Sequence, residues 1–430
     1  MRTLSLTEAS EHSLEVSDAE ASALQGAGCR LIGTDSWWGH TLNEGSSERS
    51  VLRCARRKDG RWSVRVGDVV GLVVIGDLQL VINSKIPISH LLYLLRVGGY
   101  LPRFDLSPGG GLESDSSFWD LIATWFISSL ENVLCVNLMR DYREARDFLP
   151  VLRGRLNPLA TSRSFYRGRI GLVCEYENFD FDSPLNRLLK AAARKILAAP
   201  VLDQALRRRG ARALARMDQV GELATGDDAN VVVDRRTHHY SNAAMLARHV
   251  LRGQGRFIRA GQESAWTFLI RTPEPVEAGL RELIRRHLPE VDVRKQGITL
   301  GGTKMTLNPD VVFGAPIAIG DVKYKWTRSD WERSDLYQLV AFATGYRVRR
   351  AGLFGFCSSS VESPIKVTVG EVQVTSVPWI ASTSIAPIDA AEDFVARVSF
   401  WLSTDLLTPS SAWPHVGSRR APRNIKRWPA

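Results

Sequence analysis

One stretch, LNPDVVFGAPIAIGDVKYKW at residues 307–326, constrains the fold more than any other part of the sequence. Two runs rich in β-branched residues, 310–313 and 317–324, flank the turn-forming letters GAP, and this pattern predicts a tight β-hairpin. The turn brings Asp310 to within one residue of register with Asp321. Two carboxylates are therefore expected to meet at the end of a mostly apolar hairpin.

The side chain of Lys323 is expected on the same strand face as that of Asp321, because side chains two residues apart point to one side. Neighbouring carboxylates repel each other, and a divalent cation removes that repulsion. Ligation by oxygen atoms with retained water suits Mg²⁺, and the Val322 carbonyl is a natural extra ligand. The Lys323 ammonium would stabilise charge that develops on a phosphate. The pattern favours a phosphodiester-hydrolysing site; the alternative is a surface hairpin with an ordinary Asp–Lys pair.

Two flanking helices carry further polar candidates. Residues 275–288 read as a helix whose first turn contains Glu277, which could face the metal site or simply stabilise the helix dipole. Downstream, Ser329 and Glu332 form a capping-box pattern that opens a second helix. Gln338 lies off the apolar stripe of that helix, where it could orient a water or a phosphate, or face solvent.

The composition excludes several classes of protein. A hydrophobic share of 44% and a charged share of 24% exclude wholesale disorder and fibrous rods. The net charge of +10, carried mostly by arginine, suits a polyanionic partner. The five cysteines form no C-x-x-C pair, which favours a reducing cytoplasm. The N-terminus does not read as a signal peptide, and no apolar window is long enough to predict a membrane span.

The pattern along the chain predicts a multidomain α+β protein. Residues 1–112 are expected to form a β-rich N-terminal domain, and 113–262 a mainly helical middle region. Residues 263–405 are expected to form a C-terminal α/β domain, followed by a basic tail rich in Pro, Ser and Arg at 406–430. Trp37 and Trp38 are expected in the core rather than in a partner-facing patch, because aromatic pairs in a β-rich domain are more often buried.

Other polar clusters are less informative. The second of two helices expected over residues 184–217 carries an arginine series, which reads equally as a phosphate-contacting face or a solvated surface. The series is Arg207, Arg208, Arg209, Arg212 and Arg216. His238 and His239 show no third residue at metal-ligand spacing, which favours a surface position.

The hairpin motif resembles the PD-(D/E)xK nuclease superfamily and, more narrowly, the McrC family of nuclease subunits from McrBC restriction systems, which act on modified cytosine. The resemblance extends over most of the chain. It is carried by VGLVVIGDLQLVINSKIPI at 70–88, RGRL at 153–156, CEYENFDFDSPLNRLLK at 174–190, NPDVVFG and IGDVKYK in the hairpin, and SDLYQLVAFA at 334–343.

The resemblance implies that Asp310 and Asp321 are metal ligands and that Lys323 is the catalytic lysine, with Glu277 and Gln338 at accessory positions. It also implies a target of modified double-stranded DNA and an AAA+ GTPase partner similar to McrB. In such systems the N-terminal region of the McrC-like subunit contacts the motor. The sequence contains no G-x-x-x-x-G-K-[ST], so the nucleotide-hydrolysing motor is expected on a separate chain.

We therefore expect a Mg²⁺-dependent DNA endonuclease. Two other functions remain open. One is a non-catalytic adaptor that stimulates an AAA+ motor, and the other is a standalone nuclease acting on branched or damaged DNA.

Overall fold

The computed structural model describes residues 2–30, 51–102, 118–223, 231–252, 258–260, 263–314, 317–327, 330–359 and 366–403. The chain forms two compact units. Unit 1 comprises residues 1–118 and 257–430, and unit 2 comprises residues 119–256. Unit 2 is thus inserted, in sequence, between two stretches of unit 1.

The N-terminal part of unit 1 is rich in β-structure. Its five-stranded sheet has the order β1-β6-β5-β11-β10, with β1 and β6 parallel and the other neighbours antiparallel. These strands are β1 (Arg2–Thr7), β5 (Val69–Ile75), β6 (Leu78–Asn83), β10 (Ile258–Ala260) and β11 (Glu263–Arg271). The remaining elements are β2 (Glu11–Leu14), β3 (Leu52–Arg56) and β4 (Trp62–Val66), which form a second sheet, and the helices α1 (Asp18–Arg30) and α2 (Ile88–Val97). One apolar cluster joins α1 to both sheets through Leu24, Val64 and Leu80.

The C-terminal part of unit 1 is a seven-stranded sheet covered by helices. Its strands are β12 (Val293–Arg294), β15 (Val311–Phe313), β16 (Ala318–Trp326), β17 (Arg350–Cys357), β18 (Val367–Val369), β19 (Val372–Ser376) and β20 (Trp379–Ile380). The helices are α8 (Pro273–His287), α9 (Arg333–Tyr346) and α10 (Pro387–Ser403), and a small pair is formed by β13 (Ile298–Thr299) and β14 (Thr306–Leu307).

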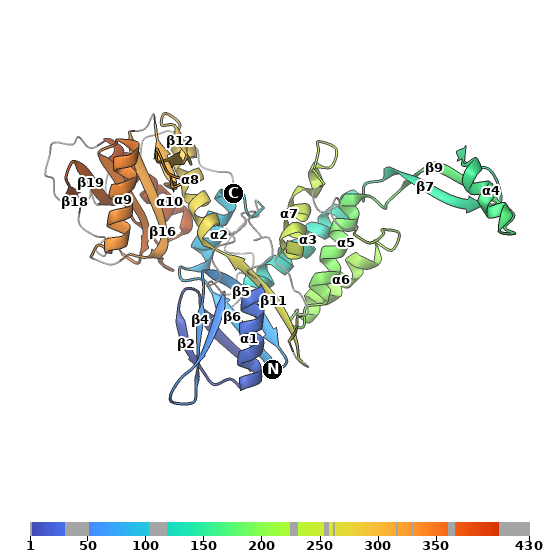
Figure 1. The fold of residues 1–430 in the computed structure, drawn as a ribbon, viewed down its shortest axis with the longest axis horizontal. Coiled ribbons are helices and arrows are strands. Elements are labelled where there is room, and N and C mark those ends of the chain that lie inside the picture. The colour runs from blue at the N-terminus through green and yellow to red at the C-terminus, as the bar shows by residue number, and fades with distance from the viewer. Residues whose placement is uncertain are drawn as a thin grey trace. The chain divides into compact units, whose positions relative to one another are not determined.

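Helices cover both faces of this seven-stranded sheet (Figure 1). Ile319 of β16 and Leu339 of α9 share one apolar cluster, so α9 covers the face of the sheet on which Asp321 and Lys323 also lie. On the other face, Trp401 of α10 packs edge-on against Phe313 and Phe354. The parallel pairing of β16 with β17 and of β17 with β19 is typical of such a layered α/β arrangement.

Unit 2 combines a helical bundle with a long antiparallel arm. The helices are α3 (Phe118–Val136), α5 (Pro184–Leu197), α6 (Gln204–Ala215), η2 (His238–Tyr240) and α7 (Ser241–Arg252). The arm, residues 141–180, contains β7 (Asp141–Leu149), β8 (Arg155–Leu156), α4 (Pro158–Tyr166) and β9 (Leu172–Asp180). In Figure 1, β7 and β9 run away from the helices of this unit and carry α4 at their far end.

Several predicted elements are confirmed. The hairpin forms from β15 and β16, the two helices expected over 184–217 are α5 and α6, and α8 covers most of the helix expected over 275–288. The predicted boundary at residue 263 differs from the structure, because β11 pairs along its whole length in register with β5 of the N-terminal sheet. The middle region also carries the β-stranded arm. Trp37, Trp38 and the tail from residue 406 lie outside the described residues.

The predicted capping box is wrong. α9 begins at Arg333, so Glu332 is its N-cap residue rather than the third residue of its first turn. The Glu332 carboxylate instead pairs with Lys325 of β16, while Ser329 lies outside the described residues. Among the helices that the structure describes, none combines the length and the apolarity that a bilayer crossing requires.

Candidate functional site

The hairpin places its two aspartates side by side. Val311 pairs with Gly320 in the antiparallel ladder, so continuing the register sets Asp310 opposite Asp321. Both residues are buried, with 8% and 3% of their surfaces exposed. The main-chain N–H of Val322 donates to Asp310 Oδ2 over 2.9 Å, which fixes the Asp310 carboxylate against β16.

Close packing explains the glycine that precedes Asp321. A Cβ atom at Gly320 would lie 2.4 Å from the ring of Phe354 on the neighbouring strand. Glycine therefore leaves room for the Phe354 ring to lie against β16 at this point. The regular pairing of the two strands ends at Val322, after which the register shifts. Asp321 thus lies at the end of the rigid ladder, close to where β16 departs from it.

Lys323 is held between β16 and α9. Its Nζ lies 2.7 Å from Asp321 Oδ2 and donates to Gln338 Oε1 over 2.7 Å. Asp321 Oδ2 is fully buried and accepts no well-aligned hydrogen bond from the described residues, although the ammonium is its ionic neighbour. The structure therefore brings together Asp321, Lys323 and Gln338, and it directs Gln338 toward Lys323.

Glu277 approaches the pair from the first turns of α8, together with a lysine that the sequence analysis missed. Lys295 follows β12 directly, and its Nζ lies 3.3 Å from Asp310 Oδ1 and 3.4 Å from Glu277 Oε2. Only the pairing of β12 with β15 reveals this proximity, because no motif spacing links residue 295 to residue 310. Arg281, one turn after Glu277 in α8, donates to the main-chain oxygen of Asp310 over 3.0 Å.

The clustered carboxylates perturb one another. Burial, followed by the charge of Asp310, raises the pKa of Glu277 to about 8. The same two causes, in the same order, raise the pKa of Asp321 to about 6. Both shifts mean that the site holds more negative charge than its surroundings can solvate, which is typical of a position that takes up a cation or a proton.

The donor set fits Mg²⁺ with retained water. Within the described part of the chain, no three His, Cys, Asp or Glu side chains converge as a metal-binding group. Mg²⁺ needs only one or two protein carboxylates when water and substrate phosphate complete its shell. Asp310 and Asp321 supply two such groups, and the buried Asp321 Oδ2 lacks an aligned donor. The Val322 carbonyl remains the predicted third ligand.

Arg207 and Arg209, two members of the predicted arginine series, serve the fold of unit 2. Arg207 donates to the main-chain oxygen atoms of Leu197 and Ala199 at the end of α5. Arg209 forms a two-pronged ion pair with Glu131 of α3. These contacts cap one helix and tie two others together, which favours the structural interpretation over a phosphate-binding face.

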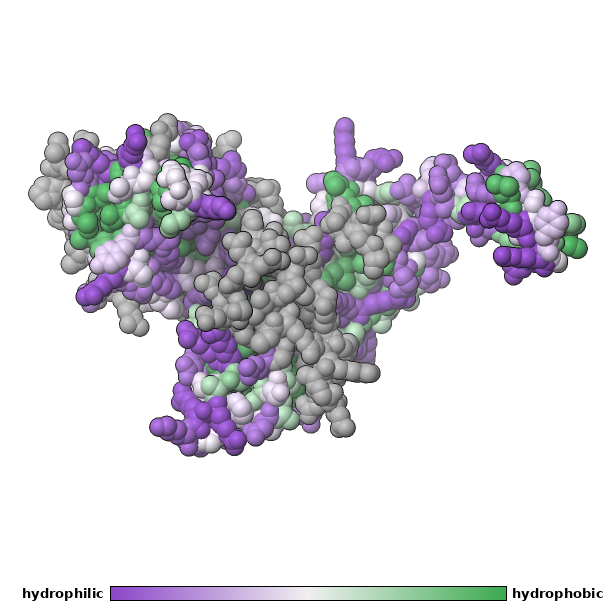
Figure 2. Space-filling model, in the orientation of Figure 1, coloured by the Kyte–Doolittle hydropathy of each residue, from purple (hydrophilic) through white to green (hydrophobic). Residues whose placement is uncertain are grey.

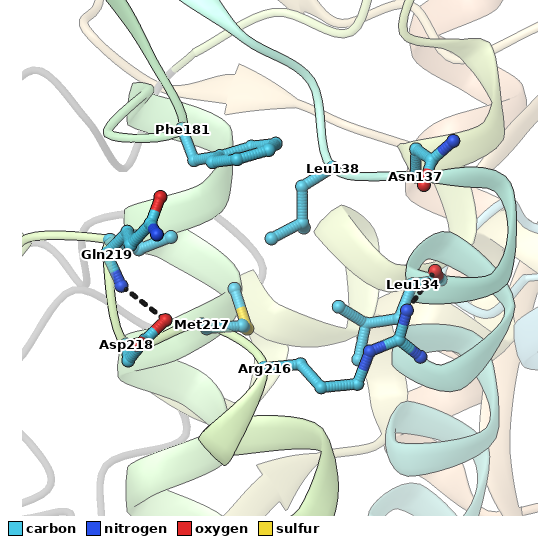
Figure 3. Close-up of a pocket in the computed structure, with 9 residues that line it drawn as sticks. Leu134, Asn137, Leu138, Phe181, Arg216, Met217, Asp218 and Gln219 are labelled. Carbon is cyan, nitrogen blue, oxygen red and sulfur yellow. Dashed lines mark hydrogen bonds between the residues drawn. The ribbon is translucent and has the colours of Figure 1, made fainter.

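A pocket of about 180 Å³ lies in unit 2 near the base of the arm (Figure 3). Leu138, Phe181 and Met217 are among the residues that line it. Arg216 also lines it but donates to the main-chain oxygen of Leu134, so its charge is already engaged within the fold. His238 and His239 lie in η2, and the described residues supply no metal-binding cluster there. Neither the pocket nor the histidine pair is as strong a candidate for a catalytic site as the hairpin.

The sequence of residues 64–354 matches the family described as "McrBC 5-methylcytosine restriction system component". The chain belongs to this family. A comparison with curated protein sequences gave no match.

Solved structures give a similar fold. A chain of the tetradecameric assembly of Thermococcus gammatolerans McrB AAA+ hexamers with bound McrC matches with a TM-score of 0.66 at 16% identity, over 93% of this chain and 100% of that chain. A chain of the Thermococcus gammatolerans McrBC complex matches with a TM-score of 0.46 at 16% identity, over 67% and 88% of the two chains.

Proposed function

We propose that this McrC-like protein is the Mg²⁺-dependent endonuclease subunit of a modification-dependent restriction system. It hydrolyses phosphodiester bonds in double-stranded DNA, and a separate AAA+ GTPase of the McrB kind activates it. The pairing of Asp310 with Asp321 beside Lys323, on an α/β domain of the PD-(D/E)xK kind, carries this proposal.

Asp310, Asp321 and the Val322 carbonyl are the proposed metal ligands. Bound there, Mg²⁺ would supply a Lewis acid that holds a phosphate oxygen and lowers the pKa of a water. The burial of both aspartates supports this role, because a fixed, water-poor pair of carboxylates offers a cation a preorganised site.

Lys323 is the proposed catalytic lysine. Its ammonium is oriented by Asp321 on one side and Gln338 on the other. A lysine held in this way stabilises negative charge on the phosphate without having to reorganise during the reaction. Gln338 acts as a positioning residue, because it contacts Lys323 rather than the carboxylate pair. Glu277 is an accessory group whose carboxyl lies beside Asp310 and shares Lys295 with it.

The arm of unit 2 is a second proposed contact with the motor, beside the N-terminal region that the family resemblance implies. Large apolar side chains are exposed at its far end, where Figure 2 shows green residues among purple ones. Tyr166 is 89% exposed and Ile170 is 92% exposed, and α4 buries none of its residues. An apolar surface of this kind suits a protein partner. The matched assembly contains McrB AAA+ hexamers, which supports an AAA+ partner for this chain.

Plasmid cleavage tests the proposed chemistry. The wild-type protein and Asp321→Ala are each mixed with the AAA+ protein encoded beside its gene, GTP or ATP, Mg²⁺ and methylated plasmid. We expect Asp321→Ala to lose at least about 100-fold in cutting rate, as happens when a preorganised electrostatic group is removed. Asp292→Ala removes an exposed carboxylate that pairs with Arg294, so it should cut like wild type. Equal cutting by wild type and Asp321→Ala would contradict the proposal.

A further inference from the structure

We propose that Lys295 holds the place of the metal ion in the metal-free site and must withdraw when Mg²⁺ binds. This inference rests on the proposed function, because it concerns the same pair of aspartates. Lys295 belongs to none of the motif positions from which the site was predicted. Its role follows only from where the fold places its ammonium.

The two carboxylate oxygen atoms of Asp310 have different partners. Its Oδ2 accepts the main-chain N–H of Val322, which anchors the carboxylate to the sheet. Its Oδ1 faces Lys295, whose Nζ lies 3.3 Å away. The same Nζ lies 3.4 Å from Glu277 Oε2, so one ammonium bridges two acidic side chains from different elements. Oδ1 is therefore the Asp310 oxygen that could bind a cation, and it is already paired with the Lys295 ammonium.

The two lysines of the site differ in how firmly they are held. Lys323 has 23% of its side chain exposed and is tied to both Asp321 and Gln338. Lys295 has 47% of its side chain exposed, so its ammonium reaches bulk water by a rotation of its own side chain. Lys295 can therefore leave the carboxylates without a change in the surrounding fold, whereas Lys323 is fixed in place.

Replacement of the Lys295 ammonium at Asp310 is electrostatically favourable only when another cation takes its place. Asp310 and Glu277 are close enough to repel each other, and the Lys295 ammonium offsets that repulsion. A divalent ion on Asp310 and Asp321 would offset more charge and would repel a neighbouring ammonium. Metal and ammonium therefore compete for Asp310, and the lysine lowers the metal affinity of the resting protein.

Calorimetric titration of the full-length protein with MgCl₂, after removal of metal with a chelator, tests the competition. Lys295→Met removes the charge while keeping an unbranched side chain, and we expect it to bind Mg²⁺ about tenfold more tightly than wild type, a usual size for coupling between two binding events. Lys295→Arg retains the charge and should bind nearly as wild type does. Arg294→Met is the matched control, because it removes the adjacent charge, which pairs with Asp292 instead.

Thermal unfolding gives a second readout. In chelator, Lys295→Met should unfold at a lower temperature than wild type, because Glu277 and Asp310 lose their shared cation. Saturating Mg²⁺ should reduce the difference in unfolding temperature between Lys295→Met and wild type. If Lys295→Met does not fold, Lys295→Gln provides a second neutral variant for both measurements.

Three results separate the possible outcomes. Tighter Mg²⁺ binding by the neutral variants alone supports the inference. If wild type binds Mg²⁺ and the neutral variants bind it equally or more weakly, the inference about Lys295 is overturned, while the proposed metal site stands. Absence of Mg²⁺ binding by wild type and by the neutral variants overturns both the inference and the proposed metal site.

Discussion

Glu8 shows how one buried acid joins the N-terminal sheet to the strand of the candidate site. It is 1% exposed and accepts hydrogen bonds from the hydroxyl groups of Tyr324 and Thr272 and from the main-chain N–H of Lys85. Tyr324 directly follows the candidate catalytic lysine on β16. The Lys85 ammonium lies 4.1 Å from the centre of the Tyr324 ring, which adds a cation–π contact. The end of β16 is therefore fixed by residues from the N-terminal part of unit 1.

This network predicts how stability depends on pH. Burial raises the pKa of Glu8 above its usual value of 4.5, so the folded protein holds the Glu8 proton more tightly than the unfolded chain does. The Glu8 contribution to the free energy of unfolding is therefore full below about pH 4.5 and is lost as pH rises through the folded pKa.

We expect Glu8→Gln to reduce the decline in stability above that pH. The measurement is denaturant unfolding of wild type and variant, both in chelator, at several pH values from 4 upward. Parallel declines in the two proteins would show that Glu8 does not titrate in this way. Ser5→Ala, a change on the exposed end of β1, serves as a control.

At the scale of elements, the packing of α8 against α2 positions Glu277. Gly279, nearly two turns into α8 and two residues after Glu277, faces the main chain of α2. A Cβ atom at Gly279 would lie 2.4 Å from the main-chain oxygen of Leu94. Main-chain atoms cannot rotate away as a side chain can, so the two helices would have to separate.

Gly279→Ala is therefore expected to destabilise the protein by about 1–3 kcal/mol, the usual cost of overpacking a close contact. Denaturant unfolding measures this loss. Gly301→Ala is the matched control, because a Cβ there meets no atom within 4 Å, and it should leave stability unchanged. A Gly279→Ala protein as stable as the control would mean that α8 and α2 adjust without cost.

The elements that sequence predicted best are those whose signals are local. The hairpin of β15 and β16 was predictable because turn letters separate two apolar runs, and the opposition of Asp310 and Asp321 follows from that register. The position of β11 was not predictable, because it depends on pairing with β5, almost two hundred residues earlier in the chain. Lys295 was missed for the same reason: its neighbours are Glu277 of α8 and Asp310, just before β15, and nothing in its own segment indicates them.

At the scale of the whole molecule, the arm carries apolar side chains that the described residues of unit 2 leave exposed. Leu159 is 74% exposed and Phe165 is 68% exposed, alongside Tyr166 and Ile170. Such residues contribute little to the stability of the isolated chain, because folding does not remove them from water. Their proposed contribution lies in the contact with the AAA+ partner.

The double substitution of Tyr166 and Ile170 by Ser is expected to weaken binding to the AAA+ partner by about tenfold or more, as loss of central apolar contacts usually does. Its unfolding temperature should match that of wild type. Val232→Ser is the control, since Val232 is 82% exposed but lies outside the arm. Titration of the partner protein by calorimetry measures the affinity, and unchanged binding by the double variant would place the contact elsewhere.

The return of the chain to the N-terminal sheet through β10 and β11 has a consequence for how such proteins diversify. Residues 119–256 form a unit that is bounded on both sides, in sequence, by the body that carries the carboxylates. If the proposed function holds, replacing this unit would change which motor the protein recruits while leaving the proposed cutting chemistry intact.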